Sequence, residues 1–301
     1  MKKRLFQGRK EGGGDSKKES LLAYKFLLPL VLVLLLFMLY PLIYGFGLSI
    51  RDEAGRFVGT KNFMLLFREP RFWVNLKLTV VYVVVSVSAI ISLGLLAAHL
   101  ITEKSRFISF IRPLYLIPWL IPNAASGILF KTLLDGNSGP IPLLYKSLTG
   151  NMIMPLANMK LSLWVVIFHE FWRGFPFAML FLAAGLTTIS RDVYEAATID
   201  GAGKWRQFVS ITLPLIKNHL FIVILLITNS TLQSSENIYS LTMGGPGYAT
   251  ETIGVRMFKT AFVYNEYNSG AATGVLLLVI ALIFMFLYSR VLKTQEEESY
   301  E

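Results

Sequence analysis

The sequence contains no cysteine, and this absence excludes disulfide bridges, thiolate metal ligands and a cysteine nucleophile. Histidine is nearly as scarce. The three histidines, His99, His169 and His219, lie too far apart in the sequence to form a metal-binding motif. The sequence therefore predicts no metal site.

Charged residues are also few, which excludes an ordinary soluble domain. They make up 16% of the 301 residues, hydrophobic residues make up 54%, and the mean hydropathy is +0.55. Soluble proteins carry about 25% charged and about 45–50% apolar residues. The net charge is +10, and eight of the 29 Lys and Arg residues precede residue 26, as in a tail at a membrane surface. We therefore expect a membrane protein that binds no nucleic acid.

Long apolar runs divide the chain into predicted spans, because a helix needs about 20 residues to cross a bilayer. The first run is too long for a cleaved signal sequence. The third contains Pro113, Pro118 and Pro122, so a kink is expected there. We predict an all-α membrane protein with six transmembrane helices, at residues 26–50, 78–102, 113–130, 161–190, 218–235 and 267–289.

The distribution of Lys and Arg predicts the orientation of these spans. A cytoplasmic N-terminus assigns 17 basic residues to the cytoplasmic side and 11 to the outside, and one, Arg173, lies within a span. This bias favours an N-in/C-in topology. The predicted domains are a basic cytoplasmic tail at 1–25, the first helix at 26–50, a five-helix core at 72–293 and an acidic cytoplasmic tail at 294–301.

Residues 190–216, between the fourth and fifth spans, carry the most information about function. Ser190 is a suitable cap for a helix that runs to about Asp200, and Gly201 then permits a sharp reversal, with a positive φ expected. A second short helix is predicted over 204–210. A helix–glycine–helix knob is more structure than a simple connection needs, so we predict a docking surface.

The same segment resembles the EAA loop of ABC importer permeases. The matching residues, at fixed spacing, are Glu195-Ala196-Ala197, Gly201, Ile211 and Leu213-Pro214. Flanking residues are similar to those of maltose-type sugar permeases, namely Pro41, Pro176-Phe177, 182–186, Ile238-Tyr239, Leu241-Thr242, Gly244-Gly245-Pro246 and Thr252. The resemblance covers roughly residues 26–293.

This resemblance implies a type I ABC importer permease fold, with 72–293 as the permease core and the loop seated in a cleft of a cytoplasmic ATPase. The implied partners are a second permease in a heterodimer, two ABC ATPase subunits, an extracellular solute-binding protein and a sugar. The implied location is a bacterial plasma membrane. The implied coupling residues are Glu195, Ala196, Ala197, Asp200, Gly201, Ile211, Leu213 and Pro214.

The chain lacks a phosphate-binding loop of the type G-x-x-x-x-G-K-[ST]. Its one Gly-Lys pair is Gly203-Lys204, but Thr198 stands where the first glycine is needed and Trp205 follows the lysine. We therefore expect no cofactor and no enzymatic activity in this chain. ATP and Mg²⁺ are expected on a separate ATPase.

Polar residues inside the spans are candidates for a substrate pathway, because they are costly in hydrocarbon. In the fourth span, Glu170 and Arg173 are one helical turn apart and able to pair, and Trp172 lies beside them. These residues could bind sugar hydroxyl groups and pack on the face of a sugar ring. A self-neutralising ion pair, or a contact to a second permease, explains them equally well.

The fifth span is strongly polar from residue 228 to residue 237. Asn229, Gln233 and Glu236 are spaced to share one face of a helix and would present two amides and a carboxylate to a polyhydroxylated cargo. Interhelical packing is the alternative. The outer turn at 244–247 resembles a contact region for the binding protein, and a plain turn is the alternative.

Two other functional classes compete with the importer. An ion-coupled secondary transporter would use Glu170, Arg173 and Glu236 for proton coupling and would need no ATPase. An intramembrane enzyme is disfavoured, because neither H-E-x-x-H nor G-x-S-x-G occurs. The fixed spacing of the loop motif favours the importer over both.

Overall fold

The computed structural model describes residues 15–102 and 113–298, and this part of the chain is helical with no strand. π-helical turns occur at Leu35–Leu39, Phe208–Thr212 and Lys259–Val263. The α-helices are α1 (Asp15–Leu34), α2 (Tyr40–Ser49), α3 (Lys61–Arg68), α4 (Pro70–Thr102), α6 (Ile117–Leu120), α7 (Asn123–Leu133), α8 (Pro140–Thr149), α9 (Met159–Leu186), α10 (Arg191–Ile199), α11 (Lys204–Gln207), α12 (Leu213–Leu215), α13 (Lys217–Leu232), α14 (Glu236–Thr242), α15 (Ile253–Phe258) and α16 (Tyr267–Glu298).

Helices long and apolar enough to cross a membrane account for most of the predicted spans. Within the described residues they are Lys25–Ser49, Pro70–Ile101, Met159–Leu186 and Tyr267–Arg290. A fifth arises if Lys204–Leu215 and Lys217–Leu232, which meet at a bend of 71°, form one span. The all-helical membrane fold is confirmed, and the count of six stays a prediction.

The predicted third span, 113–130, is broken rather than kinked. Within it, α6 and α7 are separated at Ile121 and Pro122, which have extended ψ values of 129° and 143°. A proline disfavours the helical conformation of the residue before it and removes a backbone donor. This local effect explains why 113–130 does not form one continuous helix.

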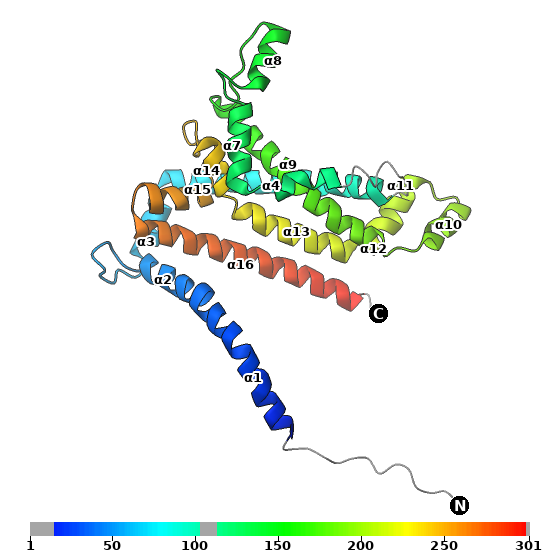
Figure 1. The fold of residues 1–301 in the computed structure, drawn as a ribbon, viewed down its shortest axis with the longest axis horizontal. Coiled ribbons are helices and arrows are strands. Elements are labelled where there is room, and N and C mark those ends of the chain that lie inside the picture. Colours follow the sequence, from blue (N-terminus) through cyan, green and yellow to red (C-terminus); the bar gives the residue numbers. More distant parts are fainter. Residues whose placement is uncertain (1–14, 103–112, 299–301) are drawn as a thin grey trace, which may run out of the picture.

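Four long helices run side by side in the bundle, with α4 packed along α9 and α13 against both (Figure 1). Small residues permit the close approach of α4 and α9. A Cβ atom on Gly94 would lie 2.7 Å from the Cβ atom of Ala178, and one on Gly174 would lie 2.7 Å from Cδ1 of Ile90. Such small-residue contacts are typical of helix packing in membranes, where van der Waals contact drives association.

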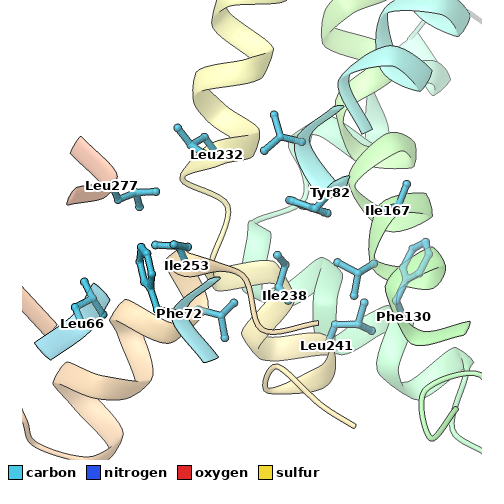
Figure 2. Close-up of a cluster of buried hydrophobic side chains, with 13 residues drawn as sticks. Leu66, Phe72, Tyr82, Phe130, Ile167, Leu232, Ile238, Leu241, Ile253 and Leu277 are labelled. Atoms are coloured by element: carbon cyan, nitrogen blue, oxygen red, sulfur yellow. The ribbon is translucent and has the colours of Figure 1, made fainter. Parts of the chain in front are cut away.

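Two clusters of buried apolar side chains lie in the bundle. One joins α4, α9, α13 and α16 to the short helices α3, α7, α14 and α15, and includes Phe72, Tyr82 and Ile238 (Figure 2). The other, which includes Met179 and Ile216, lies between α4, α9 and α13 toward the end that carries α10 and α11. The second cluster therefore supports the 190–216 loop.

The first span leaves the bundle. Helix α2 packs against α16, but α1 diverges from it (Figure 1). None of the most apolar stretch within Lys25–Ser49 is buried by the rest of the chain. This helix therefore presents its apolar surface to lipid or to another protein.

Candidate functional site

The 190–216 loop forms the predicted knob of two short helices. The Ser190 hydroxyl oxygen accepts a hydrogen bond from the backbone N–H of Asp192 at 3.2 Å. Ser190 is therefore the N-cap of α10, as predicted. Asp192 lies in the first turn, where the helix dipole favours a negative charge. The chain then reverses at Gly201, whose φ of +79° confirms the expected left-handed conformation. The second helix, α11, spans Lys204–Gln207, and 208–212 continues as a π-helical turn.

The surface of the knob carries two exposed apolar side chains that sequence reasoning missed. Ile199 is 87% exposed and Trp205 is 77% exposed, and they flank the glycine turn in the sequence. Their position on either side of the glycine turn is the signal that the sequence offers for a contact with a partner. Of the three predicted motif residues at 195–197, Glu195 and Ala196 are exposed and Ala197 is buried.

The remaining predicted coupling residues are divided between the surface and the core. Asp200 and Pro214 are exposed, whereas Ile211 and Leu213 are half-buried. Leu213 packs against the second apolar cluster. The motif thus has one part on the surface of the knob and another part that attaches the knob to the spans.

Hydrogen bonds make the knob rigid. The Tyr194 hydroxyl bonds the hydroxyl of buried Thr212 at 2.9 Å, which links α10 to the start of the fifth span. The Gln207 amide donates to the Thr198 hydroxyl and to the Ala202 carbonyl, both at 2.9 Å. These bonds tie α10 and α11 to each other and to the bent helical segment that follows.

Glu170 and Arg173 do not form the expected ion pair. The Glu170 side chain is buried and accepts hydrogen bonds from Thr231 at 3.3 Å, Ser234 at 3.1 Å and Asn237 at 2.6 Å. The Glu170 carboxylate is therefore bound by three donors from residues 231–237 instead of by the Arg173 guanidinium. Nε of Arg173 is buried without a hydrogen-bond partner in the described structure.

The Glu170 carboxylate lies at an interruption in the fifth helical segment. Helix α13 ends at Leu232 and α14 begins at Glu236, so Ser234 lies in the break and Asn237 just beyond it. The Ser234 hydroxyl has one proton, which it shares between Glu170 and the Asn237 side-chain oxygen at 2.6 Å, and the same oxygen accepts from the Ile238 N–H at 2.8 Å. This network fastens the break to α9.

The break also corrects the predicted common helical face of Asn229, Gln233 and Glu236, because one helix does not contain all three. The Gln233 amide donates to the Asn229 side-chain oxygen at 2.9 Å, and Gln233 and Glu236 are exposed. Trp172 is half-buried, with its ring centroid 5.1 Å from that of Phe130. The structure thus joins Asn229 to Gln233 and leaves their role in substrate binding as a prediction.

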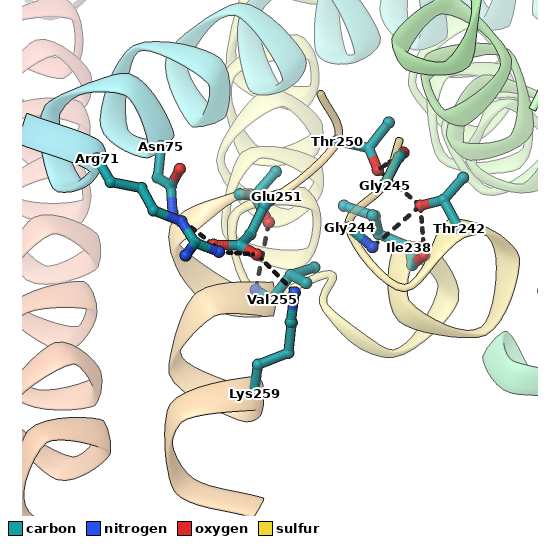
Figure 3. A network of polar contacts seen from close by, with 11 residues as sticks. Arg71, Asn75, Ile238, Thr242, Gly244, Gly245, Thr250, Glu251, Val255 and Lys259 are labelled. Carbon is teal, nitrogen blue, oxygen red and sulfur yellow. Dashed lines mark hydrogen bonds and ion pairs between the residues drawn. The ribbon is translucent and has the colours of Figure 1, made fainter. Parts of the chain in front are cut away.

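A second charged site, at the opposite end of the bundle from the knob, was not predicted. Glu251 is fully buried and accepts from Arg71 at 2.6 Å, Lys259 at 2.7 Å and Asn75 at 3.0 Å (Figure 3). The Arg71 guanidinium also lies 3.4 Å from the centroid of the Tyr248 ring. Burial raises the pKa of the Glu251 carboxyl, but these hydrogen bonds outweigh burial and lower its pKa below the ordinary value.

The turn at 244–247 packs beside this charged site. Thr242 and Thr250 bond through their hydroxyl groups at 2.6 Å, and the Thr250 hydroxyl donates to the Gly245 carbonyl at 2.8 Å (Figure 3). Gly244 and Gly247 have positive φ values of 82° and 53°. The predicted tight turn is confirmed, and a contact with a binding protein stays a prediction.

Known proteins resemble this chain in both sequence and fold. Residues 90–295 match the family model described as the binding-protein-dependent transport system inner membrane component. The trehalose/maltose transport system permease protein MalF of Thermococcus litoralis is 33% identical over 281 residues, which cover 91% of this chain and 94% of that protein. The lactose transport system permease protein LacF of Rhizobium radiobacter is 32% identical over 275 residues, which cover 88% of this chain and 92% of that protein.

The fold has the same architecture as a chain of a solved transporter. This is the bacterial alginate ABC transporter in complex with an alginate pentasaccharide-bound periplasmic protein, with a TM-score of 0.80 and 21% identity. The match covers 92% of this chain and 96% of that chain.

Proposed function

The chain belongs to the family of binding-protein-dependent transport system inner membrane components, and from this premise we propose that it is the permease subunit of an ATP-driven importer for a sugar or oligosaccharide. It is a multi-pass membrane protein of the plasma membrane. The names of its trehalose/maltose and lactose relatives support a sugar as cargo. ATP and Mg²⁺ bind to two partner ATPase subunits, and an extracellular solute-binding protein delivers the sugar.

The observation that carries this proposal is the exposed knob at 190–216. A side chain such as Ile199, with 87% of its surface exposed, gains free energy when a partner covers it. Glu195 and Asp200 add charge to the same surface. We infer that the knob seats in a cleft of the ATPase, with the knob on the cytoplasmic side of the membrane.

The hydrogen bonds within the knob support its role in coupling. Closure of the ATPases on ATP moves the knob, and the Tyr194–Thr212 contact transmits this movement to the bent fifth span. The spans then rock from an inward-facing to an outward-facing state around the polar residues of α9, α13 and α14. We infer that two permeases enclose the pathway and that the first span, whose most apolar stretch is not buried by the rest of the chain, packs against the second permease.

The secondary-transporter alternative gains no support from the arrangement of the intramembrane charges. Glu170 is buried under three donors, whereas Glu236 is exposed at the start of α14. No ion pair links Glu170 to Arg173 in the described residues, so no chain of exchanging charges connects them.

Site-directed cross-linking tests the docking of the knob. Because the chain has no cysteine, Ala196→Cys introduces one thiol on its exposed surface. We expect a maleimide–benzophenone reagent, which couples to this thiol and inserts into a C–H bond of a nearby protein on irradiation, to join it to an ATP-binding subunit, with a yield that changes when ATP is added. Thr149→Cys is the matched control, since Thr149 is exposed on α8, away from the knob (Figure 1). Equal cross-linking of both variants, or none of either to an ATPase, would contradict the proposal.

A further inference from the structure

A cavity lies between the knob and the ends of two spans. Its volume is about 560 Å³, and it is lined by the last turn of α4, the end of α9 and the inner side of α10 and α11. His99 and Leu186 contribute from the span ends, and Arg191, Lys204 and Phe208 contribute from the knob. The cavity therefore touches the knob and the spans at once.

The charge of this cavity is positive. Arg191 and Lys204 line it, and none of its lining residues within 15–102 and 113–298 is an aspartate or a glutamate. Neither of these two side chains makes an ion pair or a side-chain hydrogen bond with any residue in 15–102 or 113–298. Two unpaired cations at one cavity favour an anionic ligand, and phosphate is an anion that both Arg and Lys bind well.

The walls of the cavity are apolar where they meet the membrane. Leu186 is the last residue of the membrane-crossing helix Met159–Leu186, and His99 lies two residues before the end of Pro70–Ile101. Leu186, Ile189 and Phe208 provide an apolar lining beside the cations. A bilayer crossed by these two helices would place its phosphate groups and first acyl carbons beside the cavity.

We propose that this cavity binds the phosphate-bearing head group of an anionic phospholipid. Arg191 and Lys204 bind the phosphate, and the apolar lining accommodates the beginning of the acyl chains. The bound lipid bridges the span ends and the knob, so it steadies the knob against the spans. This last role rests on the proposed coupling function, but binding requires only that the knob lies at a membrane surface.

Lipid retention measured by native mass spectrometry tests the site. The transporter is purified with its partners in nanodiscs of phosphatidylcholine with added phosphatidylglycerol, and the lipid that stays bound on ejection is counted without ATP. We expect phosphatidylglycerol to be retained in preference to phosphatidylcholine. The Arg191→Gln/Lys204→Gln double variant should bind phosphatidylglycerol about 30-fold more weakly, because two charges near the surface are lost.

Two variants control this measurement. Lys217→Gln removes a basic residue near the knob that does not line the cavity, and it should retain the lipid as the unaltered protein does. Lys204→Arg keeps the charge and should also retain it. The ATPase that co-purifies with each variant is measured in the same sample, so a loss of assembly is distinguished from a loss of lipid.

Several results would overturn the proposal. One is equal retention of phosphatidylglycerol by the double variant and the unaltered protein, and another is equal retention of phosphatidylcholine and phosphatidylglycerol. Inorganic phosphate is the third probe. If millimolar phosphate displaces phosphatidylglycerol, and phosphate itself is retained in discs of pure phosphatidylcholine, the site takes a free anion rather than a lipid.

Discussion

Glu170 offers the sharpest test of the packing within the membrane. Its carboxylate accepts hydrogen bonds from three side chains that follow it by 61 to 67 residues, and so fastens the break between α13 and α14 to α9. Glu170→Ala removes all three bonds. Side-chain hydrogen bonds between membrane helices contribute about 0.6 kcal/mol on average and up to about 1.7 kcal/mol. We therefore expect a loss of about 2–5 kcal/mol in the free energy of unfolding.

Glu170→Gln should cost roughly half as much. Its amide oxygen still accepts, but its NH₂ group meets donors, since the Asn237 NH₂ and the Ser234 hydroxyl both point toward the side chain. Exchanging the two groups restores complementarity. In Glu170→Gln/Asn237→Asp, the new carboxylate accepts from the amide at 170 and from the Ser234 hydroxyl and Ile238 N–H that already bond residue 237.

The assay is unfolding of the purified protein by titration with SDS, followed by circular dichroism. We expect the double variant to lose less unfolding free energy than the two single variants lose together, by about 1 kcal/mol or more. Thr132→Ala is the control, because the exposed Thr132 hydroxyl bonds only a carbonyl of its own helix. If Glu170→Ala were as stable as the control, or if the exchange gave no recovery, the network would not hold the break.

Three further predictions concern the knob, the opposite end of the bundle and the pathway. Gly201→Ala should destabilise the left-handed turn by about 1–2 kcal/mol, because its φ is +79°, and should reduce sugar-stimulated ATP hydrolysis. Gly203→Ala is the control and should do neither, because Gly203 has a φ of −64° and open space around it. The pKa of Glu251 is lowered, so its ionised carboxylate stabilises the fold at pH values above the ordinary carboxyl pKa. The melting temperature should therefore fall as the pH is lowered from about 5 through the folded-state pKa. Glu251→Gln should make the melting temperature less dependent on pH in this range. Gln233→Ala should raise the KM of transport about 2- to 10-fold with little change in kcat, and an unchanged KM would remove Gln233 from the pathway.

Local sequence signals predicted much of the fold. The final span begins at Tyr267 as expected, and the helix–glycine–helix knob has its cap at Ser190 and its positive φ at Gly201. These features depend on residues close together in the chain, such as a hydroxyl two residues before the N–H that it caps. Apolar runs and helix caps can therefore be predicted from the sequence alone.

Contacts between distant residues were not predictable in the same way. Arg71 and Glu251 are 180 residues apart, and nothing near either one indicates the other. The three donors to Glu170 come from the α13–α14 region, more than 60 residues away, whereas helix periodicity indicates only near neighbours such as Arg173, one turn away on the same helix. The break at Ile121 and Pro122 was foreseen as a kink, because sequence gives the position of a proline but not the bend that packing permits.

We propose that this chain is a permease driven by a separate ATPase. The most direct test is mass spectrometry of the proteins that co-purify with the chain after gentle extraction from its native membrane. We expect to recover an ABC ATPase and a second permease, in a complex that hydrolyses ATP when the sugar-loaded binding protein is added. Recovery of this chain alone, with sugar uptake that proceeds without ATP in reconstituted vesicles, would contradict it.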